Sequence, residues 1–405
     1  MLQGIAILGA GLFATQAYVP ALVSLGKSSV PPPPLRAIYS RSEKSARELA
    51  SVVVKSLNHQ PDIYFDVPSS NSNATDSSES SMTNDSNFKG NLDALLSRSD
   101  IIAVIIVLPI TIQPSIILKC LAAGKHVLSE KPIGADVKSG LQLIKDAAQY
   151  INKGLVWRIA ENFECEDVYI KVGELVKEGK IGKIAFFKVV VFNYIDKTSQ
   201  WYQTPWRTVP EYQGGFLLDG GVHTLAAMRT ILSPSSFKIT SIVGFSSLTK
   251  DYLMPHDTIH SVVQASSTSS SESIHGLVEM TFASPLPSRP PADNILITGT
   301  EGYISINSAP FTSEDGNEGP GFEIKLRRVV KKDEETDKVE EENEEVYSFP
   351  SKGVEGEFKS FFDACEGHGD VAVGKPEEAL KDVAFIEAAL KSGGQLIDLV
   401  EMVKG

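Results

Sequence analysis

Short apolar runs of strand type alternate with helical patterns along the first 150 residues, and this alternation restricts the possible folds most. The runs of strand type are Gly4–Leu8, Leu35–Tyr39, Ile101–Leu108 and His126–Ser129. Ile101–Leu108 is apolar throughout and mostly β-branched, as expected for a strand buried on both faces of a parallel sheet. Strands separated by helices form βαβ units, so the pattern predicts an α/β fold that begins with a doubly wound parallel sheet over residues 1–152.

The pattern changes after about residue 155, where long runs of strand type follow one another with few helices between them. These runs are Ile184–Phe192, Phe237–Ser246, Thr258–Ser267, Ile274–Phe282, Asn294–Thr298, Tyr303–Ile306 and Phe322–Val330. Consecutive strands without a crossover helix pair antiparallel. We therefore predict a second α/β domain over residues 153–405, with a large, open and mainly antiparallel sheet. Its predicted helices are Asp167–Lys177, Glu355–Glu366 and Pro376–Gly393.

Two polar segments interrupt these patterns. The stretch from about residue 69 to 90 is rich in Ser, Asn, Asp and Thr. It has too little apolar surface to stabilise a fold, so we expect a disordered surface insertion. Residues 331–345 are mostly acidic, which is typical of the solvated tip of a hairpin, and an interaction tail is the alternative.

The overall charge and composition exclude several classes of partner. With a net charge of −13 and a pI of about 5.1, the chain lacks the basic surface that nucleic acids and anionic membranes need. Its three cysteines form neither a zinc-site spacing nor a disulfide framework, and we predict no metal site. No signal peptide and no run of about 18 apolar residues is visible, so we expect a cytoplasmic protein without a membrane partner.

A glycine-rich loop joins the first strand to the first helical pattern. Its sequence, Gly9-Ala10-Gly11-Leu12-Phe13-Ala14, fits the dinucleotide fingerprint with alanine at the third small position. Gly9 permits the tight turn and Gly11 lets a pyrophosphate approach the backbone. Free N–H groups at the start of the helix, at Leu12 and Phe13, then bind the anion. The loop predicts a dinucleotide site, and a glycine-rich turn without a ligand is the alternative.

The end of the second strand indicates which dinucleotide is bound. NAD sites normally place Asp or Glu there to hold the ribose 2′-hydroxyl, whereas this chain reads Tyr39-Ser40-Arg41-Ser42-Glu43-Lys44. Ser40, Arg41 and Lys44 offer donors instead, and Arg binds phosphates bidentately. We therefore expect NADP(H) rather than NAD(H). The alternative is that Arg41 is an ordinary solvated residue at the start of a helix.

The stretch Glu130-Lys131-Pro132 ends the strand that begins at His126, at the carboxyl edge where ligands of such sheets bind. The ammonium of Lys131 can stabilise an alkoxide or carbonyl oxygen during hydride transfer and can tune a neighbouring acid or base. Glu130 can anchor that ammonium or the nicotinamide ribose, and Pro132 fixes the turn, with a cis bond as one option. A surface Glu–Lys pair before a helix-starting proline is the alternative.

A second polar stretch, Gly214-Gly215-Phe216-Leu217-Leu218-Asp219-Gly220-Gly221-Val222-His223, follows in the second half of the chain. Asp219 and His223 are four residues apart, so a helix that starts near Gly220 places both on one face. Histidine exchanges protons near pH 7, and a neighbouring carboxylate can set its tautomer or bind substrate hydroxyls. The alternative is an Asp that caps the helix and a His that only packs.

Taken in this order, the glycine loop, Glu130-Lys131-Pro132 and the Asp219-to-His223 stretch resemble the Gfo/Idh/MocA family of NAD(P)-dependent oxidoreductases. The resemblance covers nearly the whole chain and looks closest to fungal cytosolic members with NADP(H) oxidoreductase activity. It implies a Rossmann domain, which binds NADP(H), followed by an α/β domain with an open antiparallel sheet, which binds the substrate and forms oligomers.

The resemblance also implies roles for individual residues. Lys131 and His223 carry catalysis, and Asp219 is a substrate ligand or orients His223. Leu108-Pro109 and Glu161-Asn162 match stretches that line the cofactor cleft of the family, where Glu130 and Lys131 also lie. Trp206-Arg207 looks like the segment that lines the substrate pocket.

Two functions are compatible with these features. The first is an NADP(H)-dependent oxidoreductase that moves a hydride between nicotinamide C4 and a hydroxyl or carbonyl carbon of a small sugar, polyol or carbonyl compound. His223 or Lys131 then exchanges the hydroxyl proton. The second is a catalytically silent, dinucleotide-binding regulator of the transcription-control type with the same fold. In either case we expect a homodimer or higher homo-oligomer through the exposed face of the second sheet.

Overall fold

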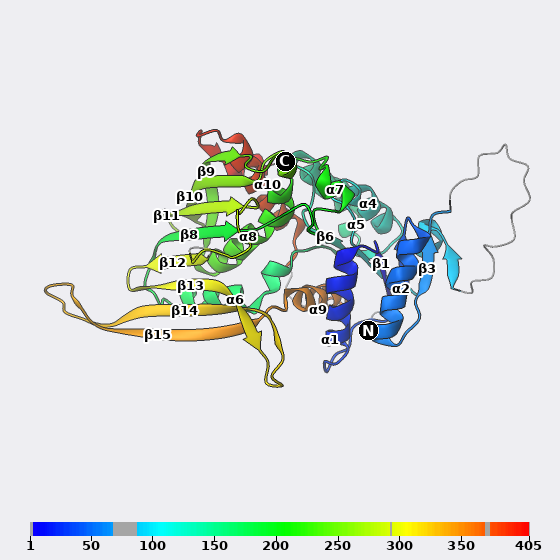
Figure 1. Ribbon diagram of the computed structural model, residues 1–405, viewed down its shortest axis with the longest axis horizontal. Coiled ribbons are helices and arrows are strands. Elements are labelled where there is room, and N and C mark those ends of the chain that lie inside the picture. The colour runs from blue at the N-terminus through cyan, green and yellow to red at the C-terminus, as the bar shows by residue number, and fades with distance from the viewer. Residues whose placement is uncertain (1–2, 68–86, 292–293, 369–372, 405) are drawn as a thin grey trace, which may run out of the picture. The chain divides into compact units, whose positions relative to one another are not determined.

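The computed structural model describes residues 3–67, 87–291, 294–368 and 373–404, and the chain forms two compact units (Figure 1). Unit 1 comprises Met1–Glu130, Leu143–Ala160 and Glu357–Pro376, and unit 2 comprises Lys131–Gln142, Glu161–Gly356 and Glu377–Gly405. The chain passes between these units several times, and the division into two domains at residue 152 stays a prediction. Helical periodicity in the sequence does not reveal which unit a helix packs against.

Unit 1 is built on a parallel sheet. In the described part of the chain the sheet has seven strands in the order β4-β3-β2-β1-β5-β6-β7, and neighbouring strands are parallel. The strands are β1 (Ile5–Leu8), β2 (Leu35–Ser40), β3 (Asp62–Phe65), β4 (Phe88–Gly90), β5 (Ala103–Ile106), β6 (His126–Glu130) and β7 (Trp157–Ala160). β1 and β5 are buried over their whole length. The strand order reverses direction at β1 and β5, which confirms the predicted doubly wound sheet.

The helices that lie wholly or partly in unit 1 match the prediction in part, because Leu92–Leu96 was not predicted and Gly353–Cys365 was expected in the second domain. They are η1 (Ala14–Tyr18), α1 (Val19–Leu25), α2 (Glu43–Leu57), α3 (Leu92–Leu96), α4 (Gln113–Ala122), α5 (Val137–Ile151) and α9 (Gly353–Cys365). Pro20 lies in the first turn of α1, directly after the π-helical turn η1. Within the described residues, no helix of either unit has the length and apolarity needed to span a bilayer.

Unit 2 is built on a larger sheet. Its nine strands, counted over the described residues, have the order β15-β14-β13-β12-β8-β11-β10-β9-β16. The strands are β8 (Ile184–Phe192), β9 (Phe237–Ser247), β10 (Thr258–Ser267), β11 (Ser273–Thr281), β12 (Ile295–Gly299), β13 (Gly302–Thr312), β14 (Glu318–Lys332), β15 (Val339–Pro350) and β16 (Ile397–Asp398). β8 and β11 are parallel and the other neighbours are antiparallel, which confirms the predicted mainly antiparallel sheet.

Helices cover one face of this second sheet. They include α6 (Asp167–Lys177), which packs on β14 and β15, and α8 (Phe216–Leu232), which packs on β9 and β11. The remaining helices of the unit are η2 (Asn162–Cys165), α7 (Pro205–Thr208), η3 (Ser233–Ser235), η4 (Asp251–Leu253), α10 (Pro376–Lys391) and α11 (Leu399–Met402). Along β11 buried and exposed residues alternate, so the opposite face of the sheet carries the exposed side chains.

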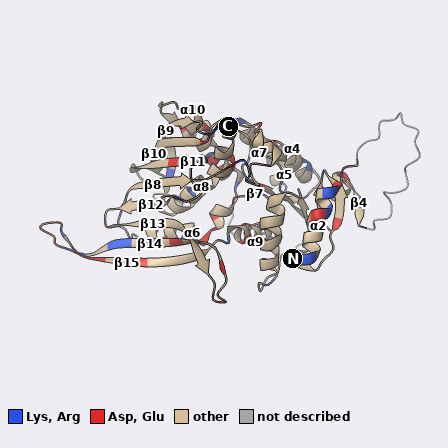
Figure 2. Ribbon diagram, in the orientation of Figure 1, with Lys and Arg blue, Asp and Glu red and all other residues tan. Residues whose placement is uncertain are grey.

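The acidic segment is a hairpin, as predicted, but its strands are longer than expected. β14 and β15 pair as far as Lys332 and Val339, with two register shifts after Val329. β15 was not predicted as a strand because glutamate has a low strand propensity. Basic residues of β14 face acidic residues of β15 (Figure 2). Arg328 pairs with Glu345 at 3.2 Å, for example, and such cross-strand pairs offset the unfavourable propensity.

The other predicted insertion lies mainly outside the described residues. Its expected end at residue 90 is wrong, because Phe88–Gly90 forms β4 and pairs with β3. The ring of Phe88 lies 4.3 Å from the ring of Phe65, centroid to centroid. This aromatic contact stabilises the edge strand β4. The strand was not predicted because the residues before it are polar.

Candidate active site

The glycine loop of unit 1 has the backbone that an anion site needs. Gly9 has a φ of 115°, and a Cβ there would lie 2.1 Å from the carbonyl oxygen of Val107, so only glycine fits. Gly11 is exposed, and nothing lies within 4 Å of the position that its Cβ would take. Leu12 and Phe13 begin the helical turns that follow. The loop thus leaves open space beside the backbone at a helix start.

The end of β2 presents cationic side chains to solvent. Ser40 is the last residue of the strand, Arg41 is exposed, and the side chain of Lys44 is 84% exposed with Glu48 at 3.9 Å. The only nearby carboxylate in the stretch, that of Glu43, already pairs with Arg47 at 2.7 Å. The predicted donors are therefore accessible, whereas the acidic residue beyond them is engaged.

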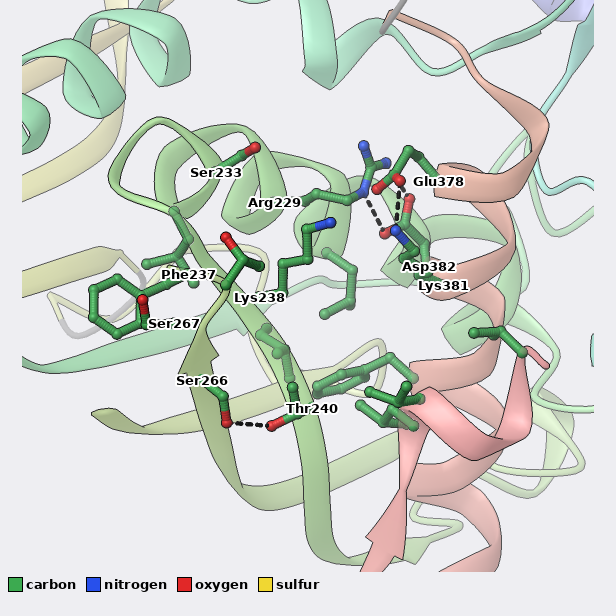
Figure 3. A pocket seen from close by; sticks show the side chains of 18 residues that line it. Arg229, Ser233, Phe237, Lys238, Thr240, Ser266, Ser267, Glu378, Lys381 and Asp382 are labelled. Atoms are coloured by element: carbon green, nitrogen blue, oxygen red, sulfur yellow. Dashed lines mark hydrogen bonds and ion pairs between the residues drawn. The ribbon is translucent and has the colours of Figure 1, made fainter. Parts of the chain in front are cut away.

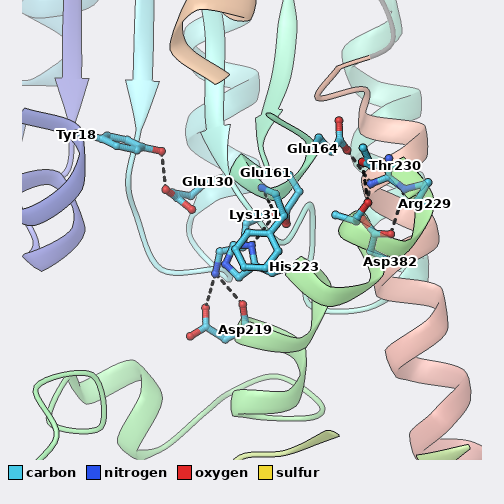
Figure 4. Close-up of polar contacts among 12 residues, drawn as sticks. Tyr18, Glu130, Lys131, Glu161, Glu164, Asp219, His223, Arg229, Thr230 and Asp382 are labelled. Carbon is cyan, nitrogen blue, oxygen red and sulfur yellow. Dashed lines mark hydrogen bonds and ion pairs between the residues drawn. The ribbon is translucent and has the colours of Figure 1, made fainter. Parts of the chain in front are cut away.

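The remaining predicted residues of unit 1 follow β5 and β6. Leu108 and Pro109 lie in the half-buried turn after β5. Glu130 ends β6 and is buried, and its Oε1 accepts a hydrogen bond of 2.5 Å from the hydroxyl of Tyr18 (Figure 4). Burial and the charge of Glu130 hold the pKa of Tyr18 well above its ordinary value. Tyr18 was not predicted, because no local pattern links it to a residue 112 positions away.

In unit 2, the side chain of Lys131 contacts Asp219. Its Nζ donates to the backbone oxygen of Asp219 at 2.7 Å and to Oδ1 at 3.1 Å (Figure 4). The Lys131–Pro132 peptide bond is cis, which was one of the predicted options. The predicted anchoring of the ammonium by Glu130 gives way to Asp219, which lies 88 positions further along the chain.

Asp219 is a buried carboxylate between two cations. Besides Lys131, the Nε of Arg207 donates to its Oδ2 at 2.7 Å. Burial alone would raise the pKa of Asp219, but the charges and hydrogen bonds of Lys131 and Arg207 hold it far below its ordinary value. Asp219 is therefore ionised and fully paired, and both cations are fixed in place by it.

Trp206 and Arg207 lie on the short helix α7. The guanidinium carbon of Arg207 is 4.0 Å from the ring centroid of Trp206 and 5.2 Å from that of Trp201. Arg207 thus stacks on aromatic rings while it binds Asp219. The structure brings this predicted substrate segment into the same polar cluster as Lys131 and Asp219, although 76 residues separate Lys131 from Arg207 in the sequence.

His223 is oriented by Glu161. The Nδ1 of His223 lies 2.6 Å from Oε1 of Glu161, and the His223 ring stacks on Phe163 with centroids 4.9 Å apart. The expectation that Asp219 orients His223 is therefore wrong, because Asp219 is occupied by Lys131 and Arg207. Glu161 directly follows β7. A carboxylate at the carboxyl end of a strand was therefore the sequence signal that could have indicated this partner of His223. Asn162 begins η2 beside it and is half-buried.

The charge state of Glu161 determines what His223 can do. Burial would raise the pKa of Glu161, but the charge and hydrogen bond of His223, together with the charge of Lys131, lower it below its ordinary value. The ionised carboxylate accepts, so Nδ1 is the donor of the short contact. Nε2 of the neutral ring then carries the lone pair.

The helix that carries Asp219 and His223 begins earlier than predicted. α8 starts at Phe216 after two glycines with positive φ, and Gly215 is the residue at the N-cap. A Cβ on Gly215 would lie 2.9 Å from a backbone oxygen, which explains the glycine. Asp219 is inside the first turn and does not cap the helix, so that alternative is wrong. The predicted shared face of Asp219 and His223 is present.

A cavity of about 340 Å³ lies elsewhere in unit 2 (Figure 3). Most of its lining is apolar and comes from α8, β9, β10, α10 and α11. One wall is polar and contains Arg229, Asp382, Glu378 and Lys381. None of the predicted site residues lines it.

Comparison with known proteins agrees with the fold. Residues 3–156 match a family model described as an oxidoreductase family with an NAD-binding Rossmann fold, and residues 173–395 match its C-terminal alpha/beta domain. The chain belongs to the Gfo/Idh/MocA family of oxidoreductases. The resemblance seen in the sequence is thus confirmed, together with a nicotinamide dinucleotide as the cofactor class of the family.

Individual Gfo/Idh/MocA proteins are similar to this chain over different shares of its length. Dehydrogenase FPY6 of Fusarium mangiferae is 34% identical over 389 residues, which cover 96% of each chain. A dTDP-3,4-didehydro-2,6-dideoxy-alpha-D-glucose 3-reductase of Streptomyces violaceoruber is 32% identical over 42% of this chain and 44% of its own. A solved oxidoreductase of Thermotoga maritima has a TM-score of 0.74 at 27% identity and covers 98% of this chain and 99% of its own.

Proposed function

We propose that this protein is an NADP(H)-dependent oxidoreductase acting on a hydroxyl or carbonyl carbon of a small sugar, polyol or carbonyl compound. The observation that carries the proposal is the polar cluster of unit 2. It contains two sets of contacts, one in which Asp219 pairs with Lys131 and Arg207, and one in which His223 pairs with the buried carboxylate of Glu161. A silent nucleotide binder needs none of this proton chemistry.

The proton step is assigned to His223 and the charge step to Lys131. Because Glu161 accepts from Nδ1, the free Nε2 takes the proton of a substrate hydroxyl and returns it in the reverse direction. Lys131, held by two oxygens of Asp219, stabilises the substrate oxygen, which becomes negative as its proton leaves to His223 or, in the reverse direction, as hydride adds to the carbonyl carbon. The bound dinucleotide supplies or accepts the hydride at nicotinamide C4.

Unit 1 supplies the cofactor contacts in this proposal. The open space beside Gly11 fits a pyrophosphate, with Leu12 and Phe13 as the residues of the helix start. Ser40, Arg41 and Lys44 fit a 2′-phosphate, because they are donors at the end of β2 and no carboxylate replaces them there. Leu108, Pro109 and Glu130, which also lie in unit 1, are proposed to complete its dinucleotide contacts.

The substrate class follows from the same cluster. Arg207 and Trp206 present a guanidinium and an aromatic ring beside Asp219, which suits a polyhydroxylated molecule with both polar and apolar faces. One relative is named for the reduction of a dTDP-linked sugar, and this name supports a sugar-related substrate.

The test is a steady-state screen of sugars and polyols with NADP⁺, and of small carbonyl compounds with NADPH. Lys131→Ala should lower kcat on the order of 100-fold, because one preorganised cation is lost at the developing charge, while NADPH affinity stays within a few-fold. His223→Gln should also lower turnover strongly. His275→Gln, an exposed histidine on β11, is the matched control.

The result can also contradict the proposal. Unchanged turnover in Lys131→Ala or in His223→Gln would remove the proposed roles. Dinucleotide binding without turnover of any compound in the screen would favour the regulator instead.

A further inference from the structure

The short helix η2 and the residue that caps it, Glu161, hold His223. Glu161, at the start of η2, pairs with Nδ1 of His223, and the ring of Phe163 stacks on the imidazole. The backbone N–H of Phe163 also donates to Oε1 of Glu161 at 3.2 Å, so both supports move together. The orientation of His223 therefore depends on the position of η2 against α8.

A second polar contact joins η2 to the same helix. Glu164, three residues after Glu161, is buried, and its Oε1 accepts from Nη2 of Arg229 at 2.7 Å. Arg229 lies six residues after His223 on α8, about 9 Å further along the helix axis. The backbone N–H of Glu164 donates to the oxygen of Glu161 at 3.1 Å, so the two acidic residues belong to one rigid turn.

Arg229 is itself fixed by a third element. Its Nε donates to Oδ1 of Asp382 on α10 at 3.2 Å, and its Nη2 lies 2.7 Å from Oδ2. The side chains of Glu164 and Asp382 are 3% and 4% exposed, so these contacts are shielded from water. Figure 4 shows Arg229 in contact with Glu164 and Asp382, and contacts on two sides restrict the movement of the guanidinium away from Glu164.

We propose that Glu164 and Arg229 are positioning residues for His223: their buried ion pair, braced by Asp382, clamps η2 to α8 so that Glu161 and Phe163 hold the imidazole with Nδ1 protonated. Neither residue touches the polar groups assigned to the substrate. The effect on turnover rests on the proposed function, whereas the effect on the tautomer of His223 does not.

One further anchor limits how far η2 can move. Glu166, just after η2, is buried and accepts from the hydroxyl of Ser351 at 2.7 Å and from the N–H of Lys352 at 3.0 Å. Loss of the Arg229 clamp therefore tilts η2 and does not release it. We expect a displaced Glu161 carboxylate and not an unfolded segment.

Glu164→Met is the most informative variant. Methionine is unbranched and fills irregular gaps, so the space remains filled while the clamp is lost. Arg229 keeps Asp382 as a one-to-one partner, which avoids a buried charge without a counterion. Arg229→Lys keeps the positive charge but cannot contact Glu164 and Asp382 with the same planar geometry. Its effect on the tautomer of His223 should therefore be intermediate. Asp257→Asn is the control, since that buried carboxylate of unit 2 binds the N–H groups of Thr249 and Lys250 instead.

The measurement is NMR of the full-length protein labelled with ¹⁵N-histidine at alkaline pH, with the His223 signals identified by their loss in His223→Gln. The wild type and Asp257→Asn should show the Nδ1–H tautomer. In Glu164→Met this form should give way largely to Nε2–H. If the proposed function holds, kcat of Glu164→Met falls on the order of tenfold through misorientation of the base, with NADPH affinity unchanged.

The outcomes separate the two proposals. An unaltered Nδ1–H signal in Glu164→Met would overturn the positioning role and leave the proposed function intact. A changed tautomer without any change of turnover in Glu164→Met and His223→Gln would support the clamp and contradict the proposed function. A wild type with Nε2–H at His223 would overturn the orientation on which both depend.

Discussion

At the residue scale, the site is a set of buried charges that each have partners from distant parts of the sequence. Asp219 neutralises Lys131 and Arg207, and Glu161 pairs with His223. The side chains of Lys131, Asp219 and Arg207 are 12%, 9% and 14% exposed, so their interactions are weakly screened by water. Removal of Asp219 leaves both cations without their shared counterion in a poorly solvated place.

Asp219→Asn tests this balance through stability. The variant leaves two buried cations without their carboxylate, so the free energy of unfolding at pH 7 should fall by roughly 3 kcal/mol. Because folding lowers the pKa of Asp219, its contribution is present above the ordinary pKa of aspartate and is lost as pH falls below about 4. Urea denaturation should therefore give a constant difference from pH 8 to 5, and a difference that grows on acidification would contradict this.

Arg41→Ala tests the cofactor assignment. Loss of a charge-assisted contact to a 2′-phosphate should weaken NADPH binding by roughly 10-fold or more and leave NADH binding unchanged. Fluorescence titration with both dinucleotides measures this preference. Arg47→Ala, which removes a nearby arginine paired with Glu43, is the matched control. Equal binding of NADPH and NADH by the wild type would show that the end of β2 does not select the phosphate.

At the element scale, helix α8 organises unit 2 because it carries Asp219, His223 and Arg229 along one length. Its contacts reach η2, α7 and α10 through these side chains. Burial above all, and then the charges of Glu161 and Glu164, raise the pKa of Asp382 to about 7 against the lowering effect of Arg229. The junction of α8 with α10 is thus sensitive to protonation near neutral pH.

This junction gives a prediction for Asp382→Asn. A carboxyl whose pKa is raised on folding stabilises the fold fully below its ordinary pKa of 3.8 and loses that contribution as pH rises through about 7. The other charges facing the junction are Arg229 on α8, Glu164 on η2, Lys238 on β9, and Glu378 and Lys381 on α10. As the pH rises from 5 to 8, the thermal unfolding midpoint of the variant should therefore increase relative to that of the wild type. A constant difference would contradict the titration of Asp382.

At the scale of the whole molecule, the open face of the second sheet carries apolar side chains without a cover from the described part of the chain. Phe186, Val262 and Leu277 are 50%, 51% and 41% exposed on three neighbouring strands, β8, β10 and β11. Val262 and Leu277 are direct cross-strand partners, so they form a continuous apolar surface. Such a surface marks an interface, which supports the proposed homodimer or higher homo-oligomer.

Leu277→Lys tests the oligomer. A lysine in the centre of this surface should shift the protein toward monomer in multi-angle light scattering at micromolar concentration, because the charge would be buried at the interface. Leu396→Lys, an exposed leucine outside this row that is 71% exposed, should leave the mass unchanged. A wild type that stays monomeric at every concentration would rule the interface out.

Several elements were predictable because their signals are local. α6, β8 and β10 have the predicted bounds, and the glycine loop and the four-residue spacing of Asp219 and His223 lie where they were expected. Periodicity and turn chemistry depend only on residues within a few positions. The acidic strand β15 was not predicted, because its stability comes from arginines across the hairpin and not from its own composition.

The sequence alone therefore determined the two types of sheet, and it predicted the dinucleotide loop and most of the side chains in the proposed site. Only the tertiary structure decided which charge pairs with which. It joined Glu161 to His223 across 62 positions, Lys131 to Asp219 across 88, and Arg229 to Asp382 across 153. The physical reason is that a buried ion takes whichever counterion the chain topology brings within hydrogen-bond distance, and sequence spacing does not record that distance.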